Sequence, residues 1–259
     1  MRLIDTHCHL DMLKGTPDEA LAEARAAGVE AVLAVGIDLP SSRSAAVLAA
    51  RFDDVYAAVG VHPHDALSFG RVARTGLERL LAQPRVVAVG ECGLDFYRDL
   101  APRDVQRAAF VEQLDLARTA GKPVCVHSRE AGGETFALLT EHGGGLGIIL
   151  HCFSSPEYVE LCNERGYFVS FAGNLTYKSS GDLQKAAMAV RDDLLLVETD
   201  APFLAPLPRR GHANRPAYVA LTAQFLARLR GWSDDEVAAV TSANARRALG
   251  MNEPAARSS

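Results

Sequence analysis

Short apolar segments rich in β-branched residues recur along the chain, and a segment long enough for a helix separates each from the next. They lie at residues 3–5, 31–36, 55–61, 86–90, 123–126, 147–150, 167–170 and 194–197. This alternation is typical of repeated βα units around a parallel sheet. Eight units within 259 residues predict a (β/α)8 TIM barrel. We expect residues 1–250 to form this single domain and residues 251–259 to form a short flexible tail.

The ends of the helical segments agree with this prediction. Capping boxes begin at Thr16 and Ser233, and Gly121 ends the helical segment 102–120. The main alternative is an open doubly wound sheet, which calls for a glycine-rich phosphate loop after the first strand. Residues 7–9 occupy that place here and contain two histidines, so we favour the barrel.

Composition limits the function and the setting. The formal net charge is −5, which argues against a protein that coats nucleic acid by charge alone but allows a local basic rim. No apolar run reaches the roughly 18 residues of a membrane span. The five cysteines are odd in number and scattered, which favours a reducing cytoplasm over a disulfide framework. The sequence leaves the oligomeric state open, and a monomer is compatible with it.

Residues that bind divalent metals follow five of the predicted strands. In a barrel, catalytic groups come from the carboxyl ends of the strands, which meet at one opening. The four imidazoles and two carboxylates found there are too many for one tetrahedral site, but they suffice for two ions roughly 3.5–4 Å apart. The predicted ligands are His7, His9, Glu91, His127, His151 and Asp200.

The order of these residues around the barrel predicts their roles. His7 and His9 share one side of an extended segment and can hold one ion together. Glu91 lies between strand one and strands five and six, so we expect it to bridge the two ions. Two cations would lower the pKa of a bridging water and supply hydroxide near neutral pH. Asp200 is expected to ligate one ion and to accept the proton of that water.

The other histidines and the cysteines have less specific patterns. His62-Pro63-His64 repeats the spacing of the first pair, and we interpret His62 either as a substrate contact at the opening or as a structural residue. His142 is expected to be a hydrogen-bonded residue of the surface or the core, and His212 to be a rim residue and not a ligand. The cysteines beside the predicted ligands are expected to be small buried packing residues. Alternation turns Cys92 and Cys152 away from the metals, and Cys125 shares the face of His127 but lies one layer deeper.

With these residues in place, the chain resembles the TatD family of metal-dependent hydrolases from residue 2 to about residue 250. Any one matching motif is weak, but the ordered set is specific. The matching segments are Asp5-Thr6-His7-Cys8-His9-Leu10, Gly60-Val61-His62-Pro63-His64, Gly90-Glu91-Cys92-Gly93-Leu94-Asp95-Phe96-Tyr97, His127-Ser128-Arg129-Glu130-Ala131, His151-Cys152-Phe153-Ser154, Glu198-Thr199-Asp200-Ala201-Pro202-Phe203-Leu204, Arg210-Gly211 and Asn214-Arg215-Pro216.

The resemblance implies a ligand set and an activity. It implies that His7, His9, Glu91 and Asp200 hold one metal and that Glu91, His127 and His151 hold the other. It also implies exonucleolytic trimming of DNA from the 3′ end, with activity in Mg²⁺ or Mn²⁺. Imidazole-rich ligation instead favours Zn²⁺, Mn²⁺ or Fe²⁺, so the metal stays open.

Charged and aromatic residues near the strand ends are candidates for substrate binding. We expect phosphate contacts from Arg129 and from the loop that follows Asp200, which contains Arg210 and Asn214 and matches the family. Further candidates are basic side chains and rings for stacking on bases, namely Lys178, Arg209, Arg215, Tyr97, Phe153 and Phe203.

Three other functions compete with a nuclease. A dihydroorotase-like amide hydrolase is disfavoured, because many of these enzymes use a carbamylated lysine where this chain has Glu91. A D-aminoacyl-tRNA deacylase, or another carboxyl-ester hydrolase of the same barrel, stays open. A barrel without enzymatic activity would bind no metal and would tolerate the loss of Glu91.

Overall fold

The computed structural model describes residues 1–251, and the predicted flexible tail lies outside the described residues from residue 252 on. Its strands are parallel and pair with their neighbours in chain order, from β1 to β8. The strands are β1 (Leu3–Cys8), β2 (Val29–Val35), β3 (Val55–Val59), β4 (Val86–Asp95), β5 (Val124–Arg129), β6 (Ile148–Leu150), β7 (Phe168–Phe171) and β8 (Leu195–Val197).

The barrel closes where β1 meets the segment that follows β8. Cys8 and Ala201 form a parallel bridge. Asp5 accepts hydrogen bonds from the Thr199 main-chain N–H at 2.8 Å and from its hydroxyl at 2.6 Å. The Asp200 N–H donates to the His7 carbonyl at 2.9 Å. The predicted (β/α)8 barrel is therefore confirmed, and the closure places the two ends of the sheet side by side.

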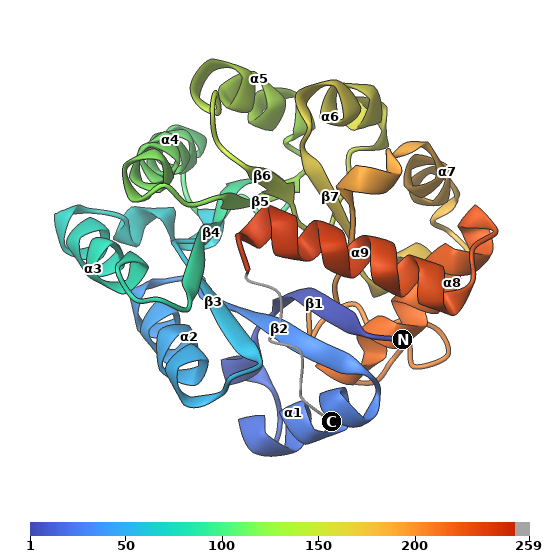
Figure 1. Cartoon of the computed structure of the whole chain (residues 1–259). Coiled ribbons are helices and arrows are strands. Elements are labelled where there is room, and N and C mark those ends of the chain that lie inside the picture. Colours follow the sequence, from blue (N-terminus) through green and yellow to red (C-terminus); the bar gives the residue numbers. More distant parts are fainter. Residues whose placement is uncertain (252–259) are drawn as a thin grey trace.

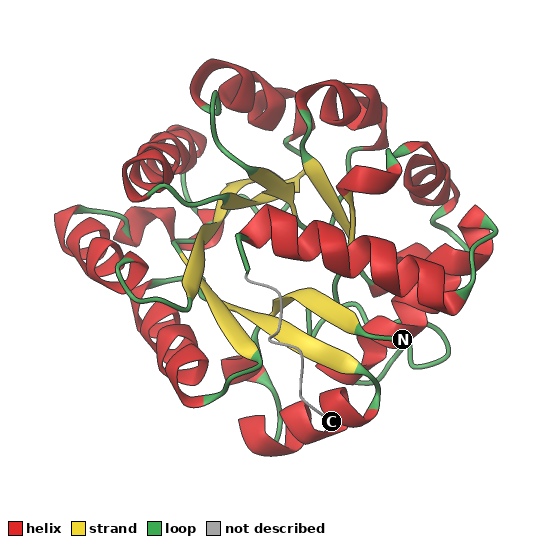
Figure 2. Cartoon of the chain, viewed as in Figure 1, coloured by secondary structure: helices red, strands yellow, loops and turns green. Residues whose placement is uncertain are grey.

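Helices surround the strands, as Figures 1 and 2 show. The α-helices are α1 (Pro17–Ala26), α2 (Leu39–Arg51), α3 (Arg71–Leu81), α4 (Arg103–Ala120), α5 (Gly132–His142), α6 (Val159–Arg165), α7 (Gly181–Ala189), α8 (Val219–Arg230) and α9 (Asp234–Leu249). Short 3₁₀ turns lie between them, at η1 (Leu10–Met12), η2 (Pro63–Ser68), η3 (Pro156–Tyr158), η4 (Gly173–Thr176), η5 (Asp192–Leu194) and η6 (Pro216–Tyr218). The capping boxes predicted at Thr16 and Ser233 are both present.

Helix α9 covers the amino-terminal end of the barrel, where it crosses the front of Figure 1. Ser242 donates to the Arg2 carbonyl at 2.8 Å, just before β1. Asn244 donates to the carbonyls of Asp192 and Leu195, at the start of β8. The carboxyl ends of the strands consequently form the other end of the barrel. No helix within residues 1–251 is long and apolar enough to cross a membrane.

Strands β4 and β5 run further than their apolar segments predict. The apolar segments end at Gly90 and Val126, but residues 92–95 of β4 pair with residues 126–129 of β5. The register shifts between Val89 and Cys92, which is the irregularity of a bulge. Glu91 lies inside this shift, with paired strand residues before and after it in the chain. Its side chain is therefore positioned by strand structure and not by a loop.

Candidate active site

One cavity of about 520 Å³ opens at the carboxyl ends of the strands. Five of the six predicted metal ligands line it, and they are His9, Glu91, His127, His151 and Asp200. His7 is fully buried and lies against this group, with its ring stacked on that of His151 at 3.8 Å between centroids. The structure therefore brings all six residues into one cluster, although they come from five segments far apart in the sequence.

Glu91 lies at the centre of this cluster. Its side chain is buried, and its two oxygens face different imidazoles. Oε2 lies 3.3 Å from His7 Nε2 and 3.7 Å from His9 Nε2. Oε1 lies 2.7 Å from His127 Nδ1 and 2.9 Å from His151 Nε2. This division of the carboxylate is the geometry of a bridge between two ligand groups.

Asp200 belongs to the first of these groups. Its Oδ1 lies 3.5 Å from His9 Nε2. Its backbone is left-handed, with φ of 56°, a conformation that aspartate tolerates better than most residues. The cluster thus divides into His7, His9 and Asp200 around Glu91 Oε2, and His127 and His151 around Glu91 Oε1.

The two carboxylates are held in their charged form. Burial would raise the pKa of Glu91, but the imidazoles that face it, His151 foremost, hold this pKa well below its usual value. Burial also opposes ionisation of Asp200, but its hydrogen bond with His9 and the charge of His151 lower its pKa overall. Two ionised carboxylates among imidazoles form a donor set that suits divalent cations.

Hydrogen bonds on the far side of the rings select the tautomers. His9 Nδ1 lies 3.0 Å from the Val35 carbonyl and must donate to it, which leaves the Nε2 lone pair free. His151 Nδ1 lies 3.0 Å from Glu198 Oε1 and likewise donates to it. Histidines that ligate metals make such bonds through the other ring nitrogen, which orients the ring and increases its basicity. In the neutral rings, both Nε2 atoms then point their lone pairs at the cluster.

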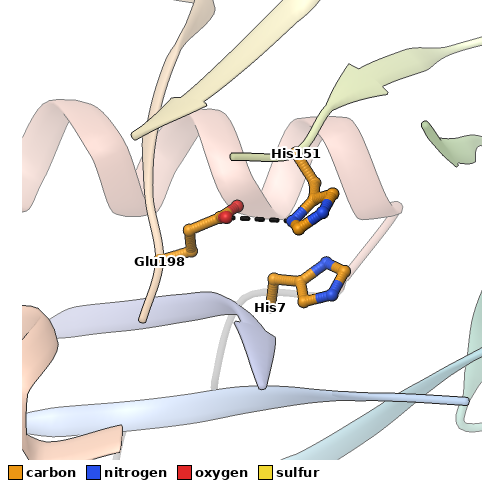
Figure 3. A group of neighbouring side chains, drawn as sticks. All are labelled: His7, His151 and Glu198. Carbon is orange, nitrogen blue, oxygen red and sulfur yellow. Dashed lines mark hydrogen bonds and ion pairs between the residues drawn. The ribbon is translucent and has the colours of Figure 1, made fainter. Parts of the chain in front are cut away.

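His7 provides the clearest test of whether a metal fits. Both of its ring nitrogens are buried without a hydrogen-bond partner among the described residues. A buried polar atom left in this way costs free energy. Figure 3 shows His7 beside His151, while Glu198 binds the outer nitrogen of His151. A cation bound between His7 Nε2 and Glu91 would satisfy this nitrogen, so the residues present fit a metal site.

His62 lies close to the cluster, but its ring proton is on the opposite nitrogen from that of His9 and His151. The His64 main-chain N–H donates to His62 Nδ1 at 3.1 Å. In the neutral ring the proton must then sit on Nε2, which lies 3.5 Å from Glu91 Oε1. Burial lowers the pKa of His62 well below its usual value, which keeps the ring neutral. His62 is therefore a hydrogen-bond donor at the cavity and not a free lone pair for a metal.

Sequence reasoning missed Asp95, which the extension of β4 places beside the cluster. Its Oδ2 lies 3.1 Å from His127 Nε2 and 3.0 Å from His64 Nε2. It thereby orients His127 so that Nδ1 faces Glu91. Asp95 shares the face of Glu91 four residues earlier, and this spacing would have found it had the strand been continued past Gly93. Glu198 belongs to one of the matching segments, but the sequence does not predict its hydrogen bond with His151 Nδ1.

We expect Asp95→Asn to weaken metal binding and to lower activity by about 10- to 100-fold, as substitutions of such supporting groups do. The amide keeps one oxygen for main-chain donors, but its NH₂ group cannot accept a proton from His127 Nε2. Metal affinity measured by competition with a chelator should fall together with kcat. Asp99→Asn, an exposed change in the turn that follows β4, is the matched control. Equal metal affinities in Asp95→Asn and the wild type would contradict the role.

The predicted rim contacts separate into two classes. Arg129 lines the cavity, and Arg210 is exposed and stacks on Tyr177, at 4.4 Å from the ring centroid. The expectation that Asn214 contacts substrate is wrong: it is fully buried, and its amide donates to the carbonyls of Thr199 and Phe203. Asn214 instead holds the loop after β8 in place.

Two further candidates for substrate binding are engaged by other residues of the chain. Phe153 is buried and packs edge-on against Phe171, at 6.1 Å between ring centroids. Arg215 forms an ion pair with Glu23 at 2.6 Å. By contrast, Tyr97 and Phe203 are more than half exposed, at 56% and 52%, and only Phe203 of these two lines the cavity.

The cysteines near the cluster are thiols and not thiolate ligands. Cys8, Cys92 and Cys125 are buried, and Cys152 is partly exposed at the cavity. Burial raises the pKa of each of these thiols above its usual value. A raised pKa keeps the sulfur protonated and weakly nucleophilic, so imidazoles and carboxylates are the candidate donors here.

A parallel barrel whose strand ends converge in such a cluster has the architecture of a metal-dependent hydrolase. The chain belongs to the TatD family, since the family model described as TatD related DNase matches residues 4–250. A metal-dependent hydrolase named TatD from Mycobacterium tuberculosis, described as uncharacterized, is 40% identical over 96% of this chain and 98% of the relative. The family seen in the sequence motifs is thus confirmed.

Two other relatives extend this comparison. The 3′-5′ ssDNA/RNA exonuclease TatD of Klebsiella pneumoniae is 37% identical over 91% of this chain and 92% of the relative. The crystal structure of YjjV, a TatD homologue from Escherichia coli, superposes with a TM-score of 0.91 at 31% identity, over 97% of this chain and 99% of that one. The protein is accordingly a hydrolytic, nuclease-type enzyme of the metal-dependent class.

Proposed function

We propose that this protein is a phosphodiester hydrolase that binds two divalent metal ions and trims DNA from the 3′ end. One observation carries the proposal: the two oxygens of Glu91 face separate groups of ligands, at 3.3 Å from His7 on one side and 2.7 Å from His127 on the other. The exonuclease name of the Klebsiella relative supports the choice of substrate. The five free cysteines fit action in a reducing cytoplasm.

We assign the two metal ions to the two ligand groups of the cluster. His7, His9 and Asp200 would hold one ion, His127 and His151 the other, and Glu91 both. When bound, Mg²⁺, Mn²⁺ or Zn²⁺ would supply Lewis acidity at the phosphate and lower the pKa of water. The chain itself supplies ionised carboxylates and correctly oriented lone pairs for this purpose.

The remaining groups bind substrate and move the proton. His62 Nε2–H is placed to donate to a phosphate oxygen, and Arg129 and Arg210 are proposed to bind phosphates near the opening. Asp200 would accept the proton of the attacking water, because its lowered pKa keeps it ionised. Attack at phosphorus breaks the bond to O3′ of the preceding nucleotide. The products are a nucleoside 5′-monophosphate and a strand shortened by one residue, whose O3′ takes up the proton.

A substrate panel tests this proposal. The purified protein, with its own metal, is incubated with labelled single-stranded DNA, with a small chromogenic phosphodiester and with D-tyrosyl-tRNA. We expect release of mononucleotides from the 3′ end, loss of activity in a chelator, and recovery when metal is returned. Elemental analysis of the active protein should give about two equivalents of metal. Deacylation of the tRNA without release of nucleotides would replace the proposal with the ester hydrolase.

A further inference from the structure

Tyr97 and Arg129 form an exposed pair beside the metal cluster, at the carboxyl ends of β4 and β5. The Arg129 guanidinium carbon lies 3.9 Å from the centroid of the Tyr97 ring. Arg129 lines the cavity, and 56% of Tyr97 is exposed. The pair therefore presents a cation and an aromatic surface to solvent directly beside His127, the metal-ligand candidate on the same strand as Arg129.

The pair is held in place before any ligand arrives. Strands β4 and β5 align Asp95 with Arg129, and the Phe96 N–H donates to the Arg129 carbonyl at 2.9 Å. Asp95 Oδ1 accepts the N–H groups of Tyr97 and Arg98, at 3.0 and 2.8 Å. The same carboxylate orients His127 through its other oxygen. The Asp95 side chain thus holds the main chain of Tyr97 and also orients a member of the cluster.

Arg129 keeps its charge available for a ligand. Within residues 1–251, no carboxylate lies within ion-pair distance of its guanidinium. By contrast, two arginines nearby on α4 are paired, Arg103 with Asp99 and Arg107 with Glu134. An unpaired guanidinium at the edge of an anion-processing cavity is suited to a phosphate, and an exposed ring is suited to a base.

From this geometry we propose that Tyr97 and Arg129 form a subsite for one unpaired nucleotide next to the scissile phosphate. The base stacks on the exposed surface of Tyr97, and Arg129 binds the phosphate of that nucleotide. The inference rests on the proposed function, because it assumes a polynucleotide at the cluster. It adds that Tyr97 binds the base and Arg129 binds the phosphate, and these two contributions can be measured without turnover.

The test measures binding of the metal-loaded enzyme to single-stranded oligonucleotides whose last linkages are phosphorothioates, which keep the charge but slow hydrolysis. A second oligonucleotide has the same linkages but lacks the bases of its last three residues. The variants are Tyr97→Ala and Arg129→Ala. The matched control is Arg51→Ala, since Arg51 stacks on Phe52 at 4.7 Å at the end of α2, away from the carboxyl ends of the strands.

The two variants should fail in different ways. Tyr97→Ala should weaken binding of the complete oligonucleotide by about tenfold and affect the abasic one much less. Arg129→Ala should weaken binding of both, and the slope of log affinity against log salt concentration should become shallower by about 0.7. Arg51→Ala should bind both as the wild type does. A merely structural role for either residue would not produce this split.

Two results would overturn the subsite. In the first, Tyr97→Ala weakens binding of both oligonucleotides equally, or of neither. In the second, Arg129→Ala leaves the slope of log affinity against log salt concentration unchanged. If the wild type still trims ordinary DNA in that case, the exonuclease proposal survives and only the subsite is lost. If the wild type hydrolyses the small diester, leaves ordinary oligonucleotides intact and binds neither probe, the exonuclease proposal and the subsite both fail.

Discussion

Glu91→Ala is expected to release metal from both halves of the cluster and to lower kcat/KM by roughly 10⁴-fold, at about 1.4 kcal/mol for each tenfold. The reason is geometric, because Glu91 alone faces both ligand groups, with Oε2 toward His7 and Oε1 toward His127 and His151. Its removal leaves Asp200 as the remaining carboxylate of the first ligand group and leaves the second group, His127 and His151, with no carboxylate of its own. The measurements are metal content per chain and hydrolysis of a small phosphodiester.

The control for this change is Glu160→Ala, an exposed carboxylate on the outer helix α6. It alters the net charge equally but lies on the outside of the barrel, so metal content and hydrolysis should match the wild type. Circular dichroism establishes that both variants are folded. If Glu91→Ala keeps two equivalents of metal, the bridging role is refuted.

Asp200→Asn is expected to retain most of the metal and to lower kcat by about 10²- to 10⁴-fold, the usual contribution of a general base. The amide oxygen can still face the His9 side of the cluster, where Oδ1 lies 3.5 Å from Nε2. It cannot accept a proton from water near neutral pH. Metal stoichiometry and single-turnover hydrolysis, measured on one preparation, separate ligation from proton transfer.

The pH profile of the wild type gives a second check of Asp200. Because its pKa is lowered in the folded protein, the carboxylate stays ionised as the pH falls through the usual range of aspartate. Hydrolysis that depends on it should therefore decline only at a pH below that range. Asp182→Asn, an exposed change on α7, is the control. Turnover of Asp200→Asn equal to that of the wild type would rule out the proton-accepting role.

The alternation of apolar and helical segments was enough to predict the barrel, because it is a local pattern that each unit repeats. The six ligand candidates followed from one general property of such barrels, namely that all carboxyl strand ends meet at one opening. Their convergence on Glu91 required no knowledge of loops. Capping boxes such as those at Thr16 and Ser233 were equally local, since both partners lie within one turn.

Asp95 shows where local pattern was insufficient. Gly90 and Gly93 interrupt the apolar run, so the sequence pattern ends the strand before Asp95. Only its pairing with β5 continues it. The carboxylate consequently reaches His127 and supports Tyr97, two contacts that no spacing along the chain specifies.

His62 and Asn214 depended on tertiary structure even more directly. Both belong to segments that match the family. His62 donates into the cavity because a main-chain N–H occupies its Nδ1. Asn214 is buried and donates to carbonyls of its own loop. The sequence by itself determined the barrel and the metal-binding residue types at its opening. The packed fold decided proton positions, hydrogen-bond partners and exposure, because these depend on atoms that are distant in the chain or on the path of the main chain.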